Sequence, residues 1–139
     1  MRISASVLAI LIIAAIAYSL VPSGSSDASA EEGAPIVKIE IPGQLSEIAM
    51  LGKQAFDIKC ASCHAENAVG QNGVAPPLVH KIYEPNHHGD ESFQRAVAMG
   101  VRAHHWKFGN MPAIEGLARA DVKAIIAYVR ELQRHNGIK

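Results

Sequence analysis

The sequence predicts a small all-α domain. Apolar residues recur at three- and four-residue spacing in 46–59, 91–101 and 121–134, which is the period of amphipathic helices. Only one short run, 36–41, alternates as a strand would, and a lone strand is marginally stable. Residues 65–89 are rich in Gly, Asn and Pro, and so long a loop in a compact domain indicates that something other than a protein core orders it. The chain of 139 residues has room for one domain.

The first 30 residues have the pattern of an export segment. Arg2 precedes an apolar run at 7–21, and an A-x-A pattern at 28–30 offers a cleavage site, as in a signal peptide. The stretch 3–21 also has nearly the ~20 apolar residues that a spanning helix needs, so an uncleaved inner-membrane anchor is the alternative. Both interpretations of residues 1–30 place the folded domain outside the cytoplasm, as in a periplasmic protein.

A linker is expected between the export segment and the folded domain. Residues 22–35 are rich in Ser, Gly, Ala, Pro and acidic residues, a composition typical of a flexible tether. The alternating run 36–41 ends at a Pro-Gly pair and is expected to lie extended on the domain surface. We therefore expect 31–44 to be a linker or extended segment and 45–139 to be the domain.

Each predicted helix has a recognisable start. Ser46 is a plausible N-cap of the first helix, which runs straight into the motif described next. Asp90 is expected to cap a second helix over 91–101. Asp121 or its neighbour is expected to open a last helix that reaches about Arg134. The apolar stripe of this last helix consists of Val122, Ile125, Ile126, Val129 and Leu132.

Residues 60–64 read Cys-Ala-Ser-Cys-His, a complete C-x-x-C-H haem-attachment site. Cys60 and Cys63 share one face of a helical turn, from which both thiols can add to the vinyl groups of a haem while His64 reaches the iron. A loop disulfide or half of a zinc site are the alternatives. A structural zinc site needs two further Cys or His at compatible spacing, whereas the chain has two cysteines in all and no later His pair so spaced. The motif therefore predicts one covalent haem c.

The order of these features resembles the class I, or monohaem, cytochrome c family over residues 45–135. The resemblance rests on a helix that enters C-x-x-C-H, a loop with prolines, a later Met-Pro pair and a C-terminal amphipathic helix. It implies a small helical domain wrapped around one covalently attached haem, in which the first and last helices cross. Gly52 and Phe56 resemble the small and aromatic residues of that crossing, and Tyr128 resembles their aromatic partner.

The resemblance also implies a second iron ligand. Met111, in a Met-Pro pair, has the setting that this family gives its axial methionine. Met50 lies on the helix before the motif and cannot swing across the ring, and Met99 is expected in the core. His104 and His105 are rivals, since neutral imidazole is a good iron ligand and would give bis-histidine coordination.

Other residues are candidates for contacts around the haem. Pro76 resembles the family's proline whose carbonyl accepts a hydrogen bond from the iron-ligating His64, a contact that fixes the tautomer of the ring. Arg102, Trp106 and Tyr83 are candidate donors to the haem propionates, because a buried carboxylate needs such partners. The alternatives are a rigid turn at the proline pair, and packing or surface roles for the other three.

Two adjacent histidine pairs are more than the family requires. One hypothesis is a second copper or zinc site shared by His87-His88 and His104-His105; the alternative is solvated loop histidines, hydrogen-bonded to a propionate or stacked on Trp106. Because neighbouring residues on an extended chain point to opposite sides, each pair is expected to supply one ligand at most.

These features predict a single-electron carrier and not an enzyme, because a thioether and an imidazole leave no open position on the iron. The expected partners are redox proteins, such as an oxidase, a dehydrogenase or a copper protein, and a monomer is expected. With 13 basic and 13 acidic residues the net charge is +0, so neither nucleic acid nor an anionic membrane surface is indicated. Two alternatives stay open: a peroxidase-like haem enzyme, if Met111 does not bind the iron, and a haem- or copper-linked sensor or assembly module that uses the histidine pairs.

Overall fold

The computed structural model describes residues 31–139. In this part of the chain the order of elements is α2 (Glu47–Lys59), α3 (Ala61–His64), the 3₁₀ turns η1 (Glu66–Ala68) and η2 (Lys81–Tyr83), α4 (Asp90–Met99) and α5 (Arg119–His135). These residues form isolated β-bridges and no strand, so the all-α prediction is confirmed. The predicted signal or anchor at 1–30 lies outside the described residues. Between residues 31 and 139 no helix is both long and apolar enough to span a bilayer.

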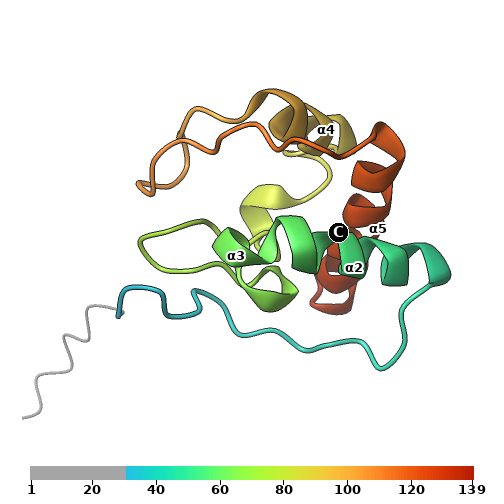
Figure 1. The fold of residues 1–139 in the computed structure, drawn as a ribbon. Helices are drawn as coiled ribbons and strands as arrows, with labels where there is room; N and C mark the ends of the chain where they lie inside the picture. Colours follow the sequence, from blue (N-terminus) through green and yellow to red (C-terminus); the bar gives the residue numbers. More distant parts are fainter. Residues whose placement is uncertain (1–30) are drawn as a thin grey trace, which may run out of the picture.

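The centre of the fold is the crossing of α2 and α5, and α4 covers one end of α5 (Figure 1). At the crossing Gly52 lies against the backbone of α5, where a Cβ added to it would lie 1.9 Å from the carbonyl oxygen of Ala124. Phe56 and Tyr128 are almost fully buried beside it, with ring centroids 5.6 Å apart in an edge-to-face arrangement. The expected roles of Gly52, Phe56 and Tyr128 at a helix crossing are thus confirmed.

The ends of α2 and α4 follow from local hydrogen bonds. Ser46 is the N-cap of α2, as predicted, and its hydroxyl accepts from the backbone N–H of Ala49. The prediction that Asp90 caps α4 is wrong: Gly89 is the N-cap, and Asp90 is the first helical residue. Its carboxylate instead accepts from the guanidinium of Arg130 at 2.9 Å, a long-range contact that local sequence does not reveal.

Two further helix ends differ from the prediction. Helix α4 ends at Met99 and not at Val101, because the next residue has a φ of +74° and Val101 pairs with a distant loop. Helix α5 begins at Arg119, two residues before Asp121. The Asp121 carboxylate accepts from the backbone N–H of Ala118 at 2.8 Å, so it stabilises the first turn from inside the helix.

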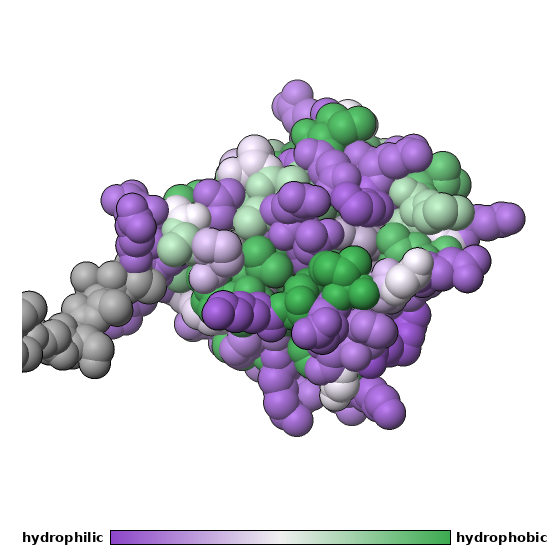
Figure 2. Space-filling model, turned by 90° about the horizontal axis from the view of Figure 1, so that it is seen from below, coloured by the Kyte–Doolittle hydropathy of each residue, from purple (hydrophilic) through white to green (hydrophobic). Residues whose placement is uncertain are grey.

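The segment 31–45 is extended and lies along the domain surface. The N–H groups of Ile36 and Val37 both donate to the carbonyl oxygen of Val69, and the backbone of Glu40 exchanges two hydrogen bonds with the side chain of Asn136. The N–H of Gly33 also donates to a loop carbonyl, so the described end of the predicted flexible tether is attached to the domain. Figure 2 shows apolar side chains gathered at the centre of the face seen from below, among hydrophilic ones.

Buried polar side chains of α5 order part of the long loop that precedes α4. Arg130 donates from its guanidinium to the Tyr83 carbonyl oxygen at 2.7 Å, and Gln133 donates to the carbonyl oxygens of Leu78 and Tyr83 at 2.8 and 3.0 Å. The Arg130 guanidinium also lies 5.0 Å from the centroid of the Phe93 ring. The protein itself therefore supplies some of the order that the loop was expected to draw from a bound group.

Replacing Arg130 by methionine should destabilise the protein by about 3 kcal/mol, because the change removes a donor from the part-buried carbonyl oxygens of Tyr83 and His88 and leaves Asp90 without its partner. The measurement is the free energy of unfolding in denaturant. Arg134→Met, at an exposed position on the same helix, is the matched control and should cost little. Equal losses in the two variants would contradict the ordering role of Arg130.

Candidate functional site

A cavity of about 620 Å³ lies between helices α2 and α3 on one side and α4 with the following loop on the other. This volume is within the about 300–1,000 Å³ typical of cofactor sites. The loop from Val101 to Ile114 lies on the opposite side of this cavity from α3 (Figure 1). Every residue that the sequence predicted for the site lines this cavity: Cys60, Cys63, His64, Pro76, Tyr83, Arg102, Trp106 and Met111.

The two cysteines lie at the junction of α2 and α3, with Cys60 between the helices and Cys63 within α3. Cys60 ends α2, with its N–H donating to the Phe56 carbonyl oxygen at 2.8 Å, and it is half-buried, whereas Cys63 is exposed. Both thiols are free, so the loop-disulfide alternative has no support in this structure. Burial, and secondarily the nearby Cys63, raises the pKa of the Cys60 thiol to about 11, so this thiol is protonated at pH 7.

His64 is buried and held in one orientation. Its Nδ1 lies 2.8 Å from the carbonyl oxygen of Pro76. A carbonyl oxygen can only accept, so Nδ1 carries the proton and the lone pair of Nε2 is left for another partner. Burial lowers the pKa of His64, although the hydrogen bond to Pro76 opposes this, so the ring is neutral at pH 7. A neutral imidazole with one oriented lone pair is the form in which histidine binds a metal.

The turn after His64 brings Pro76 back to the ring. Ala65, Asn67 and Ala68 all have φ near +60°, a conformation that costs non-glycine residues free energy. Tertiary contacts hold this turn: the Tyr128 hydroxyl donates to Asn67 Oδ1 at 3.0 Å. The crossing of α2 and α5 therefore also supports the histidine site.

Met111 approaches the cavity from the loop opposite α3. Its backbone forms two hydrogen bonds of 2.9 Å with Val101, so the position of Met111 is tied to the end of α4. Gly100 permits this pairing, because it has a φ of +74° and a Cβ there would lie 2.5 Å from the Met111 carbonyl oxygen. The other methionine that lines the cavity is Met99, which is 71% exposed. The expectation that Met99 lies in the core is wrong, since α4 ends at the cavity and its last residue projects there.

A model of the family described as cytochrome c matches residues 49–133. The chain belongs to the cytochrome c family. No curated protein and no solved structure matches it. Membership makes the chain a haem-binding c-type cytochrome, and the predicted family is confirmed. Within the matched residues, Cys60 and Cys63 have the spacing of the family's C-x-x-C-H attachment motif.

The polar wall of the cavity fits the carboxylates of a haem. The indole N–H of Trp106 is buried beside the Tyr83 side chain but forms no well-aligned hydrogen bond with any of residues 31–139. Such a buried donor is costly unless an acceptor satisfies it, and a propionate would do so. Burial raises the pKa of Tyr83 to about 12, with the neighbouring Trp106 N–H opposing the rise, so the Tyr83 hydroxyl stays protonated and able to donate. Arg102 is exposed at the same cavity and offers a cation.

The rest of the cavity wall is apolar and suits the flat macrocycle of a haem. Apolar side chains that the sequence did not assign to the site also line the cavity: Leu78, Phe93, Val97, Val101, Phe108, Pro112, Ile114 and Ile125. Phe108 and Ile114 lie in the loop between α4 and α5, outside any helix. Isolated apolar residues in such a loop were the available signal, but periodicity cannot detect them outside helices and strands.

Proposed function

We propose that this c-type cytochrome is an electron carrier whose haem is bound covalently by Cys60 and Cys63, with His64 and Met111 as the axial ligands. The observation that carries the proposal is that α3 and the loop 101–114 line the same cavity. His64, with its tautomer set by Pro76, lines this cavity, and Met111 lines it from the loop between α4 and α5. His64 is the histidine of the C-x-x-C-H motif, and Met111 is the methionine that the family resemblance implies.

The protein's own groups account for the proposed activity. The bound haem supplies an iron that takes up and returns one electron. His64 and Met111 would hold the iron from its two sides, which would leave no open position for oxygen or peroxide and would favour electron transfer over catalysis. The soft thioether of Met111 favours reduced iron, while the apolar wall excludes water. Trp106 and Tyr83 would hold the propionates and so keep the macrocycle in place.

An extracytoplasmic location completes the proposal. The apolar run at 7–21 and the A-x-A pattern at 28–30 support export, with or without retention in the inner membrane. In an oxidising compartment a free C-x-x-C pair is prone to form a disulfide, so attachment of both thiols to haem suits that location.

We propose small, transient encounters with redox proteins, at the surface where the haem-attachment motif meets solvent. Ser62 and Cys63 are exposed there, and the neighbouring Ile58 and Val74 are exposed apolar residues. A modest apolar contact suits a partner that must leave after each electron, and such interfaces usually bury less than about 1,200 Å². Because the net charge is +0, a strong overall field is not expected to steer the encounter.

The proposal is tested on the full chain produced with its haem. We expect haem to remain on the protein after denaturation, and a low-spin spectrum in both oxidation states. A weak red absorption band in the oxidised state would mark a methionine–iron bond. A high-spin oxidised spectrum together with rapid reaction with peroxide would contradict the carrier and favour the enzyme alternative.

A further inference from the structure

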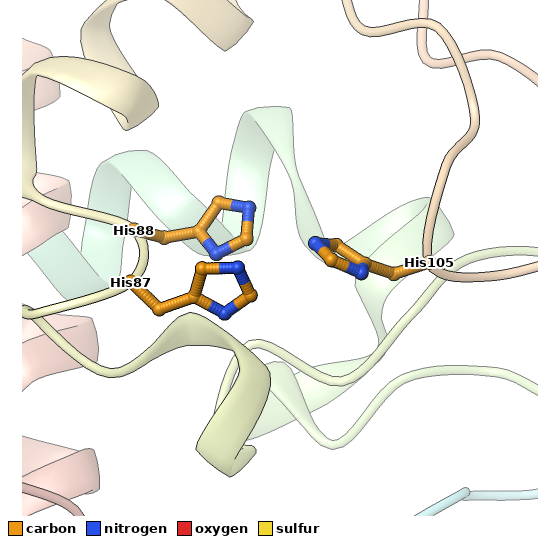
Figure 3. A group of neighbouring side chains, drawn as sticks. All are labelled: His87, His88 and His105. Atoms are coloured by element: carbon orange, nitrogen blue, oxygen red, sulfur yellow. The ribbon is translucent and has the colours of Figure 1, made fainter.

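Three histidines from two loops converge beside the haem cavity. His87 and His88 lie in the turn before α4, and His105 lies in the facing loop after it (Figure 3). The candidate ligating nitrogens of the three rings all lie within 4.8 Å of one another. The ring centroids are 4.6 to 5.1 Å apart. This group contains no carboxylate, so it offers imidazole nitrogen alone.

The convergence corrects the expectation that each adjacent pair supplies one ligand at most. The N–H groups of both His87 and His88 donate to the carbonyl oxygen of Glu84, at 3.0 and 2.8 Å, so the two residues sit on a turn and not on an extended chain. A turn allows neighbouring side chains to point the same way, as Figure 3 shows. His104 packs against His105 at 4.2 Å between centroids, but it is not one of the three converging residues.

Hydrogen bonds orient the central ring of this group. His88 Nδ1 lies 2.6 Å from the carbonyl oxygen of Ile82, so Nδ1 donates and the Nε2 lone pair is free. The Arg130 guanidinium donates to the His88 backbone carbonyl, which ties this loop to the core. An oriented tautomer with a backbone partner is the usual arrangement behind a metal-binding histidine.

We propose that His87, His88 and His105 bind one divalent transition-metal ion of the copper or zinc type. Imidazole suits these metals, whereas calcium and magnesium require oxygen ligands. Bonds of about 2.1 Å in tetrahedral geometry place the three nitrogens about 3.4 Å apart. His87 and His105 are exposed and free to rotate by the small amount that this requires. A water molecule or His104 can complete the coordination shell.

The site stands apart from the proposed iron ligation but lies next to it, since His88 and His105 also line the haem cavity. A metal ion bound there would connect the loop of His87 and His88 to the loop of His105. It would therefore hold these two walls of the haem cavity together. The same proximity makes iron ligation by one of these histidines the competing explanation, and the experiment must separate the two.

The test is titration of the haem-loaded full chain with Zn(II), and separately with Cu(II), against a competing chelator. We expect one equivalent to bind tightly, with Cu(II) giving an electron paramagnetic resonance spectrum of nitrogen coordination. His87→Ala and His105→Ala should each weaken binding by more than about tenfold, because even loss of a group that only orients a ligand costs about 10–100-fold. His135→Ala, an exposed histidine at the end of α5, is the control and should leave binding unchanged.

Three results would overturn the site. One is the absence of stoichiometric binding of either metal. Another is an equal loss of affinity in His135→Ala. The third is a change of the haem spectrum in the metal-free His105→Ala variant, which would make this histidine an iron ligand. The haem spectrum of the parent protein tests the carrier separately, so failure of one proposal is distinguishable from failure of the other.

Discussion

Replacing Met111 by alanine in the haem-loaded protein should abolish the red absorption band of the oxidised state and convert the low-spin iron to a form that binds added cyanide or azide. The side chain is the only part of Met111 that the change removes. Its two backbone hydrogen bonds to Val101 remain, so the loop should keep its path. The effect is therefore expected at the iron and not in the fold, and the variant should unfold at nearly the parent denaturant concentration.

A histidine at the same position sharpens this prediction. Met111→His should keep the iron low-spin, lose the red band and lower the reduction potential by on the order of 0.1 V, within the about 0.8 V that axial ligands span. The reason is that imidazole favours oxidised iron relative to a soft thioether. The measurements are absorption spectra and a redox titration.

Met99→Ala is the matched control, because Met99 is the other methionine at the cavity and is 71% exposed. It should retain the red band and the potential. Loss of the band in Met99→Ala with retention in Met111→Ala would assign the ligand to α4 instead. A parent protein that lacks the band while remaining low-spin would favour His104 or His105.

Replacing Gly52 by alanine should cost about 3 kcal/mol or more of packing free energy. The added methyl group would lie 1.9 Å from the Ala124 carbonyl oxygen and 2.4 Å from its carbonyl carbon. These are backbone atoms and cannot rotate away, so α2 and α5 must separate. The gain of about 1 kcal/mol that alanine has over glycine in a helix offsets only part of this. We expect the thermal midpoint to fall by about 10 °C.

Gly43→Ala makes the same chemical change where a Cβ meets no atom within 4 Å, and it should leave the midpoint nearly unchanged. Thermal unfolding of both haem-loaded variants is the measurement. Since the crossing also supports the turn after His64, Gly52→Ala should in addition weaken retention of the low-spin spectrum on heating. A Gly52→Ala variant as stable as the parent would show that the helices do not approach so closely in solution.

The success of the sequence-based predictions depended on how local the governing interactions are. The C-x-x-C-H motif consists of consecutive residues, so one helical turn is enough to bring Cys60, Cys63 and His64 to one cavity. The helices followed from the period of their apolar residues, whereas their ends did not. Asp90 forms an ion pair with Arg130, 40 residues away, and α4 stops where Val101 meets Met111. Neither partner is visible from the local pattern.

The sequence by itself determined the helical fold and the family, and it predicted residues that line one cavity, because periodicity and a contiguous motif express short-range geometry. The tertiary structure alone decided what depends on side chains from distant segments. It buried the indole N–H of Trp106 in the cavity wall, it brought Arg130 into hydrogen bonding with the loop before α4, and it placed His87, His88 and His105 together. The physical reason is that hydrogen bonding and metal ligation act over a few ångströms, and only the folded chain brings segments so far apart in sequence to that distance.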